Sequence, residues 1–200
     1  MLVARRPNGR PGDQLGEDRV QLLTRRGAEW LSTAADRPHE CREIWEMDPR
    51  KPVALPAGRL FDVVVVNQQL GVETFDQLVR RQLPVGPVEI DRAAKKVGFF
   101  LPPDSREWFR RQVTCETTSP PEYRYLGRES MVVVPGRLSL SEDRYAWLSA
   151  PFRQLDANPA RAVALALMLV ASAELLARAE QYGEERIWVL ERVVHHAERG

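Results

Sequence analysis

The stretch LFDVVVV, residues 60–66, decides the fold class. It is short, rich in β-branched residues and bounded by Pro56-Ala57-Gly58 on one side and by segment 67–71 on the other. Because its apolar residues do not alternate with polar ones, it predicts a strand that is buried on both faces, in the middle of a sheet. Asp62 interrupts the pattern. A carboxylate there is either half of a metal site or the polar start of a buried strand.

Helices and further strands are expected around this strand. Val72, Phe75 and Leu78 recur at helical spacing, which predicts a helix packed on the sheet. Between residues 36 and 58 several prolines exclude long helices, and we expect a surface segment there with Trp45 turned inward. The other expected elements are a hairpin of 88–90 and 95–101, a short helix at 102–113, a strand pair at 123–127 and 130–136, and a last strand or loop at 138–151. The fold class is therefore α+β with a mixed sheet.

The end of the chain differs in character. Asn158-Pro159 is a good cap and first-turn pair, and the Ala- and Leu-rich stretch after it favours a helix that stops near Gly183. A second helix is expected over 184–198, so that the two form a helical hairpin. The expected organisation is a disordered leader at 1–16, an α+β domain at 17–152 and the hairpin at 153–200.

Composition places the chain among globular proteins. It has 200 residues, 44% hydrophobic and 28% charged, and a net charge of +1 that gives no global attraction to nucleic acid. Arginine outnumbers lysine by 26 to 3, a bias that favours forked phosphate contacts but also follows from a GC-rich genome. Cys41 and Cys115 lie far apart, which indicates a reducing cytoplasm. The apolar run 162–173 is shorter than the roughly 20 residues of a membrane span, so we expect no membrane association.

Few residues carry recognisable chemistry. A two-metal site commonly takes two acids two positions apart on one strand, but Val64 stands where the second would be. His195 and His196 are adjacent on a helix and point about 100° apart, so we expect no metal there. Basic residues interleaved with Tyr123 and Tyr125 suit single-stranded nucleic acid, although exposed arginines on an ordinary hairpin fit the same pattern.

Four segments in succession resemble the bifunctional DNA primase/polymerase (Prim-Pol) N-terminal domain. They are LPAGRLFDVV at 55–64, PVGPVEIDRAAKKVGFFLPP at 84–103, YLGRESMVVVPG at 125–136 and RYAWLSAP at 144–151, and the likeness covers about residues 25–152. The resemblance implies an α+β fold with an RRM-like sheet. Active members carry an acid-x-acid pair, of which Asp62 matches only the first acid. They also carry Ser-x-His, for which Ser139 and Ser141 are the nearest match, with serine in place of histidine. We read these three residues as remnants of a catalytic site, without a metal or cofactor.

Two hypotheses of function remain open. The first is a catalytically inactive, nucleic-acid-binding or regulatory accessory protein, with DNA as a partner. The residues that would bind nucleic acid are Arg59, Arg124, Arg128 and Arg137. The second is a scaffold that binds a protein partner, or a second copy of the chain, through the helical hairpin. Its surface would include Val163, Leu167, Val170, Ile187, Trp188 and Val194. A third reading, an active polymerase, would need acids placed elsewhere, such as Glu142 or Asp143.

Overall fold

The computed structural model describes residues 25–152, 155 and 158–197, with side chains up to Tyr182. The expected leader lies outside the described residues. A helix at 25–32 comes first. The elements that follow are α2 (Pro38–Met47), β1 (Val53–Pro56), β2 (Asp62–Asn67), α3 (Gln68–Arg80), β3 (Val88–Asp91), β4 (Lys96–Leu101), α4 (Arg106–Glu116), β5 (Arg124–Leu126), β6 (Met131–Val134), β7 (Tyr145–Ser149) and α5 (Ala160–Ala197). The fold is α+β, as expected.

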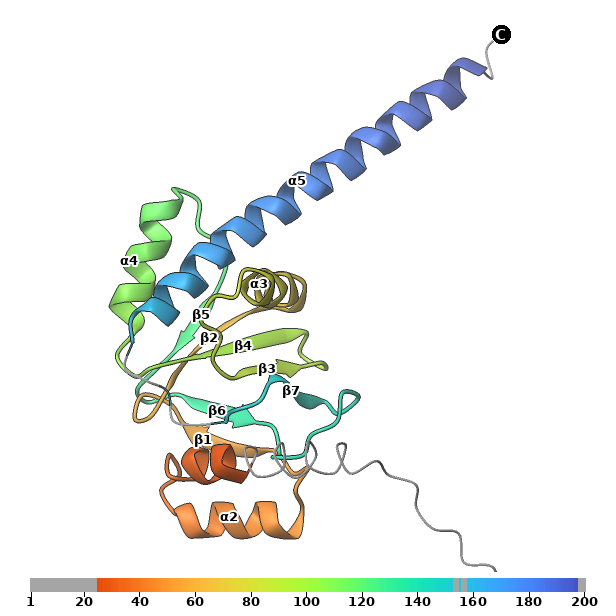
Figure 1. Cartoon of the computed structure of the whole chain (residues 1–200). Helices are drawn as coiled ribbons and strands as arrows, with labels where there is room; N and C mark the ends of the chain where they lie inside the picture. Colours follow the sequence, from red (N-terminus) through yellow and green to blue (C-terminus); the bar gives the residue numbers. More distant parts are fainter. Residues whose placement is uncertain (1–24, 153–154, 156–157, 198–200) are drawn as a thin grey trace, which may run out of the picture.

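A five-stranded sheet of order β5-β2-β4-β3-β7 forms the centre of the molecule (Figure 1). Its strand pairs are all antiparallel, where a mixed sheet was expected. Val63 and Val64 have no exposed surface and belong to two different hydrophobic clusters, one on each face of the sheet. The prediction that LFDVVVV is a strand buried on both faces is therefore confirmed.

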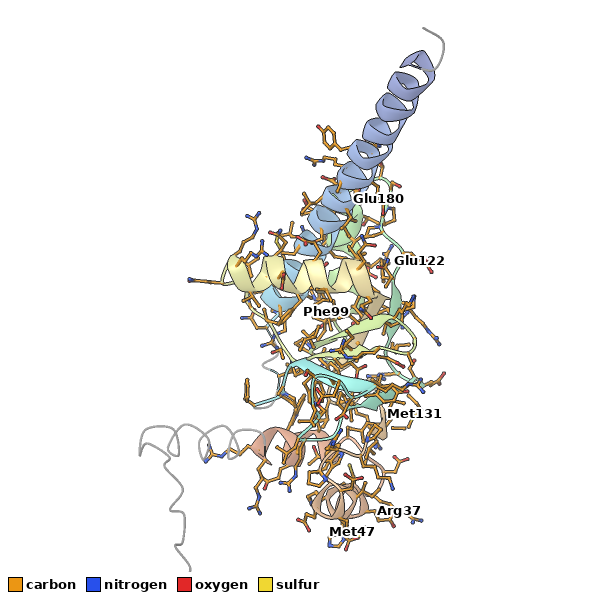
Figure 2. The ribbon with its side chains drawn as sticks, turned by 90° about the vertical axis from the view of Figure 1, so that its right-hand side faces the viewer. Arg37, Met47, Phe99, Glu122, Met131 and Glu180 are labelled. Atoms are coloured by element: carbon orange, nitrogen blue, oxygen red, sulfur yellow. The ribbon has the colours of Figure 1, made fainter. Side chains whose placement is uncertain are left out.

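Both faces of this sheet are covered. Helices α3, α4 and α5 lie on one face, and Figure 2 shows Phe99 of β4 beneath α3. The two-stranded sheet of β1 and β6, then α2 and the helix at 25–32, lie on the other face (Figure 1). The central sheet is thus an inner layer.

Two local expectations are wrong, namely that segments 123–127 and 130–136 are strand partners and that Val72 faces the sheet. The segments at 123–127 and 130–136 do form strands, but β5 pairs with β2 and β6 pairs with β1, so they are not partners. In the segment where long helices were excluded, Trp45 is turned inward as expected. The segment does contain the short helix α2, because Pro38 occupies its first turn, where the missing N–H is not needed. Val72 is exposed, and α3 instead buries the face of Gly71, because only a residue without Cβ can lie this close to Val97 of β4.

The C-terminal hairpin is also wrong, because α5 is a single helix from Ala160 to Ala197. Gly183 does not end it. A glycine inside a helix costs about 1 kcal/mol relative to alanine. No proline follows, and several strong helix formers do, so one glycine is too weak a break.

The first half of α5 belongs to the same hydrophobic core as β2. Its residues Ala162, Leu165 and Leu169 are buried against α3 and α4. By length and composition, Ala160–Tyr182 could cross a membrane, with a mean hydropathy of 1.8, yet 39% of this window is buried inside the domain. Core helices pass the same test, and Ala162, Leu165 and Leu169 place the first half of this segment in the core.

Candidate functional site around Asp62

Asp62 begins β2 and is 3% exposed. Its Oδ2 accepts a hydrogen bond from the Tyr125 hydroxyl at 2.6 Å and another from the backbone N–H of Ser105 at 3.3 Å. The register explains the first contact, because Tyr125 of β5 lies directly opposite Val64. Residues 62 and 64 share one face of the strand, so the tyrosine reaches Asp62 diagonally.

Burial raises the pKa of Asp62, while the hydrogen bonds from Tyr125 and Ser105 lower it. The pKa of Tyr125 is also raised, first by burial and then by its bond to the Asp62 carboxylate, so the phenol stays protonated and donates. The Arg106 guanidinium lies 4.7 Å from the centre of the Tyr125 ring and donates to the Tyr125 carbonyl at 3.4 Å. This arrangement holds Asp62 as an internally satisfied carboxylate.

Two loops meet beside Asp62. Gly58 has a φ of +85°, and a Cβ on it would come within 2.4 Å of the backbone nitrogen of Arg128. A Cβ on Gly127 would lie 3.4 Å from Asp62 Oδ1. The close approach brings Arg59 and Arg128 onto neighbouring loops at this edge of the molecule.

These two arginines already have partners, but weak ones. Arg59 pairs with Asp36 at 3.1 Å and Arg128 with Asp104 at 3.5 Å, and all four side chains are at least 61% exposed. Exposed pairs of this kind contribute about 0–1 kcal/mol. Both guanidinium groups can therefore exchange an aspartate for another anion at little cost.

The residues here do not fit a two-metal centre. Val64, at the position of the second acid, is fully buried in the core beneath the helices. Among the described residues, no three His, Cys, Asp or Glu side chains come together to hold a metal ion. In this geometry Asp62 serves as the polar start of a buried strand, held by Tyr125 and Ser105.

Ser139 and Ser141, the other expected remnants, lie elsewhere. The Ser139 Oγ accepts a hydrogen bond from the Trp147 N–H at 3.3 Å, and the Ser141 hydroxyl donates to Glu142 at 2.7 Å. Both precede β7, which is three strand spacings from β2, about 14 Å across the sheet. Asp143 is on the same loop and pairs with Arg50. The structure therefore does not bring these residues to Asp62.

The predicted tyrosine platform for bases is not formed. The rings of Tyr123 and Tyr125 pack against Phe109 of α4, with centroids 5.1 and 6.1 Å away. Arg124 is exposed on the edge strand β5, and Arg137 lines a separate cavity.

The expected protein-interaction residues divide into two groups. Val170 is 5% exposed and lies in the core, while Val163 and Leu167 are partly buried, so the first group does not form a free surface. The second group, Ile187, Trp188 and Val194, lies where α5 has no described side chains.

Residue patterns alone did not identify Ser105 and Arg106 as neighbours of Asp62. The contact of Tyr125 with Asp62 follows from the strand register, which puts Tyr125 opposite Val64. Finding it required the pairing of β5 with β2, which segment patterns do not specify.

The fold and the site together define a class of protein: an α+β domain whose central strand begins with a single acid, Asp62. The model of the family described as "Bifunctional DNA primase/polymerase, N-terminal" (Prim-Pol) matches residues 6–162, so the chain belongs to the Prim-Pol family. Neither the curated proteins nor the solved structures contain a match.

Proposed function

We propose that this chain is a non-catalytic member of the Prim-Pol family that binds nucleic-acid phosphates beside Asp62. The observation that carries the proposal is the state of Asp62, whose Oδ2 is taken up by Tyr125 and Ser105 while Val64 replaces the second acid. Two-metal nucleotidyl transfer needs converging carboxylates. An internally bonded carboxylate without a second acid at position 64 supports a binding role instead.

The surface beside this site suits a phosphate backbone. Arg59, Arg124 and Arg128 are exposed around it, on β5 and on the two loops that meet at Gly58. Arginine forks match phosphate oxygens, and the existing pairs with Asp36 and Asp104 are weak. Because the net charge is only +1, binding would come from this local group rather than from the overall charge.

Fluorescence anisotropy with labelled single-stranded and duplex DNA, at low and moderate salt, tests the binding role. Each phosphate contact to single strands contributes about 0.7 to the salt slope. Replacing Arg59, Arg124 and Arg128 together by alanine should therefore reduce the slope by about 2. The matched control replaces three exposed arginines on other surfaces, Arg80, Arg81 and Arg178. Equal loss in both variants, or no binding at low salt, contradicts the proposal.

A nucleotide-incorporation assay on a primed template with Mg²⁺ or Mn²⁺ tests the absence of catalysis separately. We expect no incorporation by the natural chain or by Asp62→Asn. Incorporation that the Asp62→Asn change abolishes would show that the site is live.

A second candidate function is protein interaction through α5. The observation that favours it is that the helix continues beyond α3 and α4, past Glu180, to Ala197 (Figures 1 and 2). Most helical stability in proteins comes from tertiary packing of one face, so a partner packed on this part of α5 would stabilise it. If that partner is a second copy, light scattering should give twice the mass of 22.8 kDa. The double change Ile187→Glu with Val194→Glu should then return the protein to the monomer. A monomeric natural chain removes the homodimer from this hypothesis.

A further inference from the structure

A small cavity lies on the far side of the central sheet from α5. It is formed by the helix at 25–32, α2 and the segment after β6, and its volume is about 50 Å³. Its polar and aromatic lining consists of Arg25, Glu29, Arg42, Trp45, Glu46 and Arg137. None of the arginines beside Asp62 contributes to it, so the cavity is separate from the proposed DNA surface.

Arg137 is the unusual member of this lining. Its Nε is buried, and among the residues that the structure describes it has no hydrogen-bond partner. A buried N–H of a charged group without an acceptor is destabilising, because its hydrogen bond to water is lost and not replaced. The side chain also enters no ion pair with another described residue. An acceptor supplied from outside the chain would remove this cost.

The charges in the cavity leave one positive charge unmatched. Arg25 is hydrogen-bonded to Glu29 at 3.3 Å, so these two balance each other. Arg42 and Arg137 remain against Glu46 alone, which leaves a net charge of +1. A group with one negative charge would therefore neutralise the cavity.

We propose that this cavity binds a single carboxylate side chain from an acidic peptide segment of a protein partner. The volume is far below the roughly 300–1,000 Å³ of a small-molecule site but admits one terminal group. Arginine binds carboxylates through parallel N–H···O bonds, which gives the unsatisfied Nε an acceptor. The buried Ala28 and Trp45 provide apolar wall for the methylene groups behind the carboxylate.

The same charges disfavour a phosphate. A phosphate monoester carries about −1.5 to −2 at neutral pH and would exceed the single unmatched charge. A nucleic-acid strand would bring further phosphates toward Glu29 and Glu46, which repel them. An isolated carboxylate avoids both problems.

NMR of the full chain tests the proposal through the side-chain signals of Arg137 Nε–Hε and the Trp45 indole N–H. Titration with sodium acetate, and then with the peptide acetyl-Gly-Glu-Gly-amide, should move both signals with saturation. Sodium chloride at the same ionic strength should move neither to saturation. Arg137→Gln should weaken the Trp45 response at least tenfold, whereas Arg80→Gln, an exposed position on α3 outside the cavity, should leave it unchanged.

Arg42→Gln is a second variant for use if Arg137→Gln does not fold, because Arg42 is exposed, and it should weaken the response severalfold. Identical shifts with acetate and chloride would overturn the proposal. Saturation by inorganic phosphate at lower concentration than acetate would also overturn it, since the site would then select phosphate.

Discussion

Asp62 illustrates how one buried carboxylate is kept in a core. Its desolvation raises its pKa, and a tyrosine hydroxyl and a backbone N–H offset part of that effect. The nearby charges of Asp104 and Arg106 act on this pKa in opposite directions. Neither Tyr125 nor Ser105 is a neighbour in sequence, so this carboxylate joins β2, β5 and the start of α4. At the scale of single residues, the position acts as a structural junction.

Tyr125→Phe should therefore destabilise the protein. The change removes the donor and leaves the Asp62 carboxylate under-satisfied, at a cost of about 1–3 kcal/mol. Tyr123→Phe is the matched control, because Tyr123 packs on the same Phe109 ring and its hydroxyl does not contact Asp62. Urea unfolding measures both. Equal effects of the two changes would mean that the bond to Asp62 contributes nothing.

Glu89 is a second buried acid, and its carboxyl group is protonated at neutral pH. Burial, and then the charge of Asp91, raise its pKa from an ordinary 4.5 to about 8, and its Oε2 has no hydrogen-bond partner among the described residues. It lies over Gly98, where a Cβ would come within 2.9 Å of Oε1. The glycine on β4 thus makes room for a carboxyl group that stays protonated at neutral pH.

The stability of the chain should consequently fall as pH rises from about 4.5 to about 8. In that window the folded state holds the proton of Glu89 and the unfolded state has released it, so deprotonation favours unfolding. The contribution is complete below the unfolded pKa and is lost above the folded one. Glu89→Gln should remove this dependence, a change on the order of a few kcal/mol across the window.

Urea titrations at several pH values measure this dependence, with Glu122→Gln as the control on an exposed surface (Figure 2). The quantity to compare is the difference in unfolding free energy between the natural chain and Glu89→Gln. If this difference is the same at pH 5 and pH 8, the pKa of Glu89 is not raised.

At the scale of elements, α5 shows how context overrides a local stop signal. Its first half is fixed by packing against α3 and α4, which nucleates the helix. Once nucleated, each added residue requires little further free energy, so the helix passes through Gly183. Gly183 is therefore an interior position of α5.

Two glycine-to-alanine changes test this interpretation. Gly183→Ala should raise helicity and stabilise α5 by up to about 1 kcal/mol, because alanine is the better helix former. Gly71→Ala in α3 should instead destabilise the protein by about 1–3 kcal/mol, since the new Cβ would meet the Val97 Cβ at 2.4 Å. Circular dichroism and thermal unfolding report both. A loss of helicity in Gly183→Ala would indicate that this glycine ends the helix after all.

At the scale of the whole molecule, the central sheet is enclosed by helices on one face and by β1, β6 and α2 on the other (Figure 1). Tyr123 and Tyr125, the aromatic residues that were expected to face bases, pack against Phe109 and are only partly exposed. The exposed side chains proposed to bind phosphate beside Asp62 are arginines. Nucleic-acid binding there would involve the backbone and not the bases.

DNA binding should therefore depend little on the presence of bases. An oligonucleotide of abasic residues should bind within about twofold of oligo-dT of the same length, because base stacking contributes about 1–3 kcal/mol per base where it occurs. Competition anisotropy at fixed salt compares the two. A tenfold or larger loss with the abasic strand would reveal a stacking surface, against the packing of Tyr123 and Tyr125.

Local patterns determined several features of this protein by themselves. The apolar run of β2 indicates burial on both faces, and the short turn between β3 and β4 indicates a hairpin. The succession of motifs indicates the family. Each of these signals lies in residues close together in sequence. The absence of a second acid at Val64 is likewise plain from the sequence.

Only the tertiary structure decided the rest. The pairing of β5 with β2 and the bonds of Tyr125 and Ser105 to Asp62 join segments tens of residues apart. The continuity of α5 depends on the packing of its first half against other helices. Such contacts are selected by the total burial of the folded chain. A strand pattern or a single glycine is compatible with more than one partner, and the core determines which one forms.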